Sequence, residues 1–210
     1  MLFEDTYTTL SGPGKSDYRI KSSRFLGFAF PISSEHEAKT ILNRLKKEHP
    51  QANHHCYAFR LTTDPTVYRS SDDREPSGSA GKPILGAINT AGITYALVVV
   101  VRYFGGTQLG IPGLIQAYRE SASEAIVEAG KKTGFMIDHF QLEFPYGQLN
   151  EVYRILKASG ANITSQHLDE PSLIHLEIRR SLSKAMLDAL LAHPTLGHLC
   201  QVESIHNGTT

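Results

Sequence analysis

The chain has little cysteine and no excess of charge of either sign. Only two cysteines, Cys56 and Cys200, occur in 210 residues, which excludes a disulfide framework and indicates a reducing compartment. Lysine plus arginine and aspartate plus glutamate number 21 each. The protein as a whole therefore carries no electrostatic field that would draw it to nucleic acid or to a membrane surface.

Long apolar segments are also missing. No run approaches the roughly 20 apolar residues that a membrane-spanning helix needs. The first ten residues include Glu4 and Asp5 and lack the basic and apolar regions of a secretory signal peptide. We therefore expect a cytoplasmic protein with no membrane partner. Its hydrophobic fraction of 40% and charged fraction of 20% are typical of a globular chain of one large or two small domains.

The secondary-structure pattern predicts two domains, residues 1–133 and 134–210, joined by a linker at Lys131–Gly134. Hydrophobic periodicity and turn residues predict the elements of both. In the first domain these are strands at 17–20, 25–30 and 54–61, a helix behind a capping box at Ser34 and Glu37 that ends before Pro50, and helices at 83–91 and 112–130. The second domain has the order β-α-β-β-α-β, which is typical of a ferredoxin-like fold. Its last strand is predicted at 197–205, and one sheet face is expected to be open to a partner.

The stretch Ala96–Ala117 is the centre of the first domain. Val98–Val101 is an unbroken β-branched run, which indicates a strand buried on both faces. Arg102 and a glycine loop follow, and a helix begins near Pro112. A glycine loop at a helix N-terminus can bind an anion, and an arginine adds a bidentate phosphate contact. The alternative is a tight strand-to-helix turn beside a surface arginine.

A polar loop, residues 70–81, supplies a second candidate. Asp72, Asp73 and Glu75 could hold Mg²⁺ through carboxylate oxygens, and Lys82 could contact phosphate. The alternative is a solvated turn. The loop is no nucleotide-binding P-loop, because prolines stand at two positions that the pattern requires to be glycine and serine or threonine.

His54, His55 and Cys56 form the third candidate. On a strand, His54 and Cys56 point to one face and His55 to the other. A cysteine–histidine catalytic pair is one interpretation. A buried strand with polar edges is the other, and the chain offers no second ligand pair for a structural zinc site.

Together these stretches resemble the IMPACT family in its bacterial two-domain form. The residues that carry the resemblance are His54–Cys56, Ala58, Ser71–Asp73, Glu75, Pro76, Gly78, Ala80–Pro83, Val100–Gly106, Leu109, Gly110, Gly113, Leu114, Ala117 and Tyr118. The resemblance covers most of residues 16–130. This chain departs from the family pattern at Arg74 and Pro112, where glycine is usual, at Ser79, where threonine is usual, and at Arg119, where glycine is common.

The resemblance implies an α+β protein. Its N-terminal domain would be similar to the second domain of ribosomal small-subunit protein five, and its ferredoxin-like C-terminal domain to the last domain of elongation factor G. Eukaryotic relatives are linked to control of translation through the amino-acid-starvation kinase, and bacterial members are proposed to bind nucleic acid or the translation machinery. Fold alone is weak support for function.

We therefore expect a binding protein that regulates translation by contacting RNA, the ribosome or a translation factor. The expected anion or nucleic-acid site consists of Arg102, Lys82, Gly105, Gly106, Gly110, Tyr103, His54 and His55. One alternative is a metal-dependent enzyme that acts on a phosphorylated small molecule, with Mg²⁺ on the acidic loop. The other is a protein-partner adaptor that uses the open sheet face. The sequence does not indicate an oligomeric state.

Overall fold

The computed structural model describes residues 5–205, so the first four residues of the segment examined for a signal peptide lie outside it. The chain forms two compact units, each of mixed helix and sheet, as expected for an α+β protein. The first unit is Tyr7–Gly134, and the second comprises residues 135–205 together with Asp5 and Thr6. Asp5 belongs there because Arg179 and Ser181 donate hydrogen bonds to its carboxylate. No described helix is long and apolar enough to cross a membrane.

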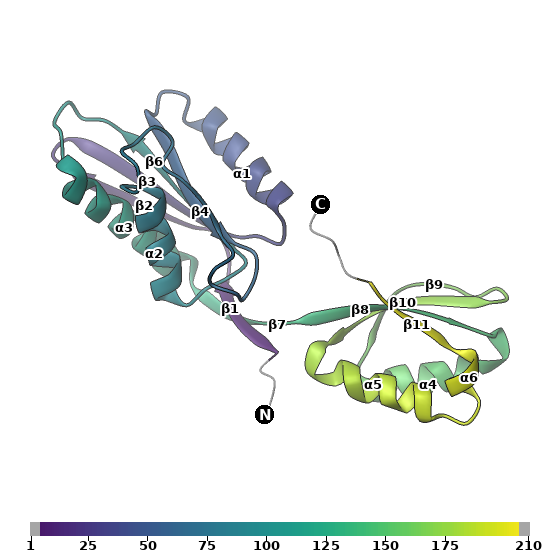
Figure 1. Ribbon diagram of the computed structural model, residues 1–210. Coiled ribbons are helices and arrows are strands. Elements are labelled where there is room, and N and C mark those ends of the chain that lie inside the picture. The colour runs from purple at the N-terminus through teal and green to yellow at the C-terminus, as the bar shows by residue number, and fades with distance from the viewer. Residues whose placement is uncertain (1–4, 206–210) are drawn as a thin grey trace. The chain divides into compact units, whose positions relative to one another are not determined.

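The first unit is built on a five-stranded sheet of order β2-β3-β6-β4-β5, with antiparallel pairing throughout. The strands are β2 (Gly14–Ile20), β3 (Ser23–Pro31), β4 (His54–Arg60), β5 (Arg69–Ser71) and β6 (Ala96–Tyr103). One face of the central strand β6 joins the core under α2 (Gly81–Ala91) and α3 (Gly110–Ala129), and the other packs under α1 (Glu35–Glu48) (Figure 1). The valine run is buried on both faces, which confirms the prediction.

The ends of α1 agree with the sequence prediction in part. Ser34 accepts a hydrogen bond from the backbone N–H of Glu37, as a capping residue should. The Glu37 carboxylate, however, accepts from the backbone and hydroxyl of Ser33 rather than from the N–H of Ser34. The reciprocal half of the capping box is therefore displaced by one residue. The helix ends at Glu48, before Pro50.

Helix α3 lies very close to the sheet. A Cβ atom at Gly27 on β3 would stand 2.4 Å from the Ser121 carbonyl oxygen, and one at Gly14 on β2 would stand 2.3 Å from the Ala125 carbonyl oxygen. Only glycine permits such a backbone approach. These two contacts fix the position of α3 and thereby the position of its N-terminus.

The predicted linker at Lys131–Gly134 is wrong. These residues belong to β7 (Lys131–Phe135), which pairs with β1 (Thr6–Leu10) in a separate two-stranded sheet. Most side chains of β7 are exposed, so the segment lacks the apolar alternation that identifies a strand in a sequence. The predicted last strand is also too long, because Leu196–Leu199 forms the short helix α6.

The second unit has the predicted β-α-β-β-α-β order. Its strands are β8 (Ile137–Phe144), β9 (Asn162–His167), β10 (Ser172–Arg179) and β11 (Gln201–Ile205), and they form an antiparallel sheet of order β11-β8-β10-β9. The 3₁₀ turn η1 (Tyr146–Gln148) leads into α4 (Leu149–Ser159), and α5 (Arg180–Ala192) follows β10. Both helices cover the same face of the sheet (Figure 1).

Candidate functional site

Three segments far apart in sequence meet beside α3. Strands β4 and β6 pair so that His54 stands opposite Arg102. The Arg102 guanidinium donates to the Glu75 Oε1 atom at 2.5 Å, and the Tyr118 hydroxyl donates to the same oxygen at 2.7 Å. His54 Nε2 lies 3.6 Å from that oxygen, while its Nδ1 lies 2.8 Å from the Asp73 carbonyl oxygen. The acidic loop therefore folds against the strand that carries the arginine.

Arg102 and Glu75 form a buried ion pair. Their side chains are only 6% and 4% exposed, so the charges are little screened by water. The Arg102 guanidinium also lies over two rings, 5.3 Å from the Phe25 centroid and 5.4 Å from the Phe104 centroid. Its Nε atom is buried and has no hydrogen-bond partner within residues 5–205. Such an unpaired donor is uncommon and calls for an explanation.

Arg102 and Glu75 line a cavity of about 470 Å³. The other lining residues are Asn53, His54, Pro76, Phe104, Gln108, Leu109, Gly110, Ile111 and Leu114. This volume is in the range of small-ligand sites. Phe104 and Ile111 are 46% and 54% exposed, so an apolar rim surrounds a polar floor.

The N-terminus of α3 opens onto this cavity. Leu109 occupies the N-cap position and makes no side-chain hydrogen bond to the first turn. Gly110 has a φ of +69°, which glycine adopts without strain. The first N–H groups of a helix have no partner within the helix, and here no capping side chain takes their place. The cavity therefore combines a helix N-terminus with a buried guanidinium, a combination that favours an anion.

The acidic loop is held by its own backbone. The Asp72 carboxylate accepts hydrogen bonds from the N–H groups of Gly78, Ala80 and Gly81 at 2.7–3.0 Å. Burial alone would raise the pKa of Asp72, but these three donors more than offset it and hold the pKa below its ordinary value. The Asp73 carboxylate accepts from the backbone N–H of His55. Each carboxylate therefore already has protein donors.

The expected Mg²⁺ ligands consequently do not gather. Glu75 binds Arg102, while Asp72 and Asp73 bind backbone. Among residues 5–205, no group of three histidine, cysteine or acidic side chains is arranged to hold a metal ion. The structure thus offers no grouping for the metal-dependent reaction considered above.

Several residues of the expected anion site lie elsewhere. Tyr103 and His55 point to the α1 side of the sheet, where the Tyr103 hydroxyl lies 2.8 Å from His49 Nδ1. They alternate with Arg102 and His54, which face α3. Lys82 is exposed on the first turn of α2 and does not line the cavity. The structure therefore brings together Arg102, His54 and Gly110 but not Tyr103, His55 or Lys82.

Gly105 and Gly106 have a structural role in the loop after β6. A Cβ atom at Gly105 would stand 2.1 Å from the Ser22 carbonyl, so this glycine packs against the β2–β3 turn. Gly106 has a φ of +86° and open space beside it. Neither lines the cavity. They shape the loop that carries Phe104 to the rim.

Cys56 does not form a catalytic pair. Its thiol donates to the Asp72 carbonyl oxygen and to the Tyr118 hydroxyl. Burial raises the pKa of the Cys56 thiol well above its ordinary value, which disfavours the nucleophilic thiolate. Tyr118, which sequence reasoning did not single out for the site, links Cys56 to Glu75. The signal available in the sequence was its place among the residues that carry the family resemblance.

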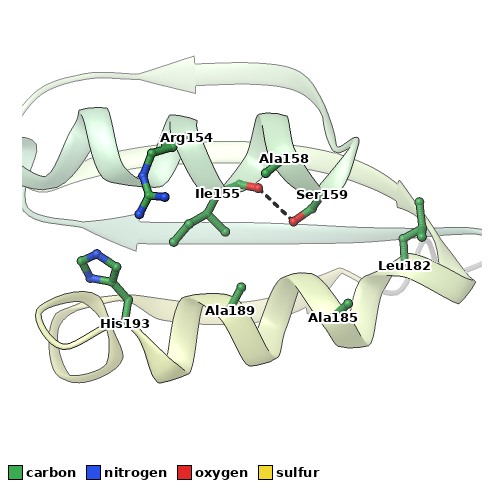
Figure 2. A pocket seen from close by; sticks show the side chains of 8 residues that line it. All are labelled: Arg154, Ile155, Ala158, Ser159, Leu182, Ala185, Ala189 and His193. Carbon is green, nitrogen blue, oxygen red and sulfur yellow. Dashed lines mark hydrogen bonds between the residues drawn. The ribbon is translucent and has the colours of Figure 1, made fainter.

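A second cavity, of about 410 Å³, lies between α4 and α5 in the second unit (Figure 2). Half of its eight lining residues are small: Ala158, Ser159, Ala185 and Ala189. Arg154 and His193 stand at one end of it (Figure 2), and both lie within ion-pair distance of Glu151. This cavity therefore has no buried unpaired donor comparable with Arg102.

The fold defines a two-unit α+β protein whose larger unit carries a cavity with a polar floor and an apolar rim. The family profile of the Impact N-terminal domain matches residues 21–126. The chain is 40% identical over 153 residues to the "IMPACT family member in pol 5'region" of Thermus thermophilus, covering 72% of this chain and 81% of that protein. It is 33% identical over 151 residues to IMPACT family member YigZ of Escherichia coli, covering 70% and 74%. The chain belongs to the IMPACT family.

A solved structure shares the fold. The crystal structure of a protein described as hypothetical matches 98% of this chain and 100% of its own, with 26% sequence identity and a TM-score of 0.75.

A third sequence relative is IMPACT family member YvyE of Bacillus subtilis, which is 32% identical over 165 residues, or 79% of this chain and 76% of that protein.

Proposed function

We propose that the cavity at the start of α3 binds RNA, and that the protein acts in the regulation of translation through this contact. The observation that carries the proposal is the buried Arg102 beside the uncapped N-terminus of α3. Both supply N–H donors to a phosphate. The link to translation rests on the family resemblance, which implies domains similar to the second domain of ribosomal small-subunit protein five and the last domain of elongation factor G.

The hydrogen-bond donors at the cavity suit a phosphate even though the chain as a whole is neutral. Glu75 balances the single charge of Arg102, so the attraction for a phosphate comes from N–H donors and the α3 N-terminus rather than from a net positive charge. The N–H donors of the cavity and the half-exposed Phe104 provide hydrogen bonds and stacking. Proteins that bind single-stranded nucleic acid combine these two contacts. The binding is expected to be local to the cavity rather than spread over a basic surface.

The direct test places a negative charge at the cavity. Ile111→Glu adds a carboxylate on the first turn of α3, where acidic residues are favourable for the helix, so the variant should fold. Val127→Glu adds the same charge on the same helix at a side chain that is 79% exposed and does not line the cavity. Fluorescence anisotropy with labelled RNA should show at least tenfold weaker binding for Ile111→Glu and none of this loss for Val127→Glu, a difference of about 1.4 kcal/mol.

Salt dependence provides the second readout. Binding that uses phosphate contacts weakens as salt rises, because counterions are released from the nucleic acid. RNA affinity that does not depend on salt, or equal affinity of the two glutamate variants, would contradict the proposal. Binding of a purified translation factor with the same dependence on Ile111 would instead identify a protein as the ligand.

A further inference from the structure

We infer that the ligand is single-stranded RNA, with one nucleotide in the cavity, its phosphate at Arg102 and the α3 N-terminus and its unstacked base against Phe104, and with the next phosphate of the strand on Arg74. This inference rests on the proposed function and names the form of RNA that the site accepts. It depends on the shape and lining of the cavity and on an exposed arginine bound to a lining residue, which the site described above does not use.

The cavity is lined as a base-binding site would be. Phe104 offers a half-exposed ring, and Leu109, Ile111 and Leu114 add apolar wall. Asn53 and Gln108 place amide groups on the same cavity. The Asn53 Oδ1 atom already accepts the N–H of Phe104 at 2.8 Å, so its amide NH₂ is left to donate. Aromatic rings and amide side chains together recognise splayed-out bases.

A duplex does not present such a base. In double-stranded RNA the bases are stacked and paired, and proteins contact mainly sugars and phosphates. A cavity of about 470 Å³ with an aromatic rim can be filled by a base only when the base leaves the stack. The lining therefore favours a single strand over a helix.

Arg74 is placed to hold the phosphate of that strand. It directly precedes Glu75 in the sequence, and its guanidinium donates to the Asn53 carbonyl oxygen at 3.0 Å. Glu75 and Asn53 both line the cavity. The Arg74 side chain is 77% exposed, and its Nε lies 3.8 Å from an Asp73 carboxylate oxygen. The guanidinium is thus anchored to the backbone of a lining residue while most of it faces solvent.

The backbone conformation of Arg74 allows a substitution by glycine that should not disturb the fold. Its φ is +70°, a conformation that glycine adopts freely and other residues adopt at a cost. Arg74→Gly should therefore leave the fold intact while it removes one cation next to the lining residues Asn53 and Glu75. Arg154→Ala, which removes an arginine that is 67% exposed in the second unit, is the matched control.

The experiment compares one labelled oligonucleotide of about ten nucleotides in three forms: single strand, duplex, and a single strand with abasic sites. We expect the single strand to bind at least tenfold more tightly than the other two. Phe104→Ala should weaken single-strand binding about 5- to 150-fold. Tyr68→Ala, at a side chain with the same 46% exposure that does not line the cavity, should not. Arg74→Gly should lower the slope of log K against log salt by about 0.7.

The outcomes separate the two proposals. If no form of the RNA binds, both fail. If duplex and abasic RNA bind as tightly as the single strand and Phe104→Ala has no effect, the base-in-cavity inference is overturned while RNA binding stands. An unchanged salt slope in Arg74→Gly would overturn the phosphate contact at Arg74.

Discussion

At the scale of single residues, the Glu75 carboxylate balances a buried cation and accepts hydrogen bonds from two buried side chains. Its Oε1 atom accepts from two buried donors, Arg102 and Tyr118. Removing it would leave a buried guanidinium without its counter-charge, which costs about 3–5 kcal/mol. Chemical denaturation should therefore show this loss for Glu75→Ala. Glu48→Ala, at an exposed pair with Arg44, should cost less than about 1 kcal/mol. Equal losses in the two variants would contradict the buried pair.

His55 gives the fold a dependence on pH at the same scale. Burial lowers its pKa, the Asp73 carboxylate acts in the opposite direction, and Lys46 and His49 add to the lowering. The unfolded chain therefore takes up a proton at His55 near its ordinary pKa of about 6.5, before the folded protein does. The contribution of His55 to the free energy of unfolding should be complete above about pH 6.5 and should decrease as the pH falls below that value. Urea titrations at about pH 7.5 and about pH 5 measure the change.

The His55→Gln variant isolates this contribution from the other histidines. It should lose less stability than the parent protein between the two pH values, because glutamine does not titrate. An equal loss in both proteins would show that His55 does not contribute.

At the scale of elements, the close contact of α3 with β3 positions the cavity. Gly27→Ala would place a Cβ atom 2.4 Å from the Ser121 carbonyl oxygen and 2.3 Å from the Ser16 Oγ atom. Such overpacking costs about 1–3 kcal/mol. Gly86→Ala on α2 meets nothing within 4 Å and should stabilise the protein by about 0.5–1 kcal/mol through helix propensity. Opposite shifts of the thermal midpoint are therefore expected, and a stabilising Gly27→Ala would refute the contact.

The elements also show what can be predicted from sequence. The valine run and the helix after Pro112 were recognisable because their signals are local: a β-branched stretch and a helical period. The predicted linker became β7 because its pairing with β1 joins opposite ends of the first unit. The meeting of Arg102 with Glu75 could not be derived either, since it depends on the register of β4 on β6 and on the fold of the acidic loop. The prediction that Lys82 belongs to the anion site was wrong because the position of Lys82 also depends on the fold of that loop.

At the scale of the whole molecule, the two units have separate cores. Ile174, Leu142 and Phe144 belong to a cluster in the second unit, while the valines of β6 belong to clusters in the first. Ile174→Ala should destabilise the second unit by about 2–5 kcal/mol. Hydrogen exchange followed by mass spectrometry should then show faster exchange in residues 137–205 and unchanged protection of β6. Faster exchange in β6 as well would mean that the two units unfold together.

The central claim is that RNA binds at the cavity of the first unit. The sheet face of the second unit that α4 and α5 do not cover, where His175 lies between Ser165 and Gln141, is the competing surface. The most direct measurement is a titration of the isotope-labelled protein with single-stranded RNA, followed by the NMR shifts of the backbone amides. We predict shifts at Asn53, Phe104, Gly110 and Ile111. Shifts confined to β8 and β10, with none around the cavity, would contradict the account.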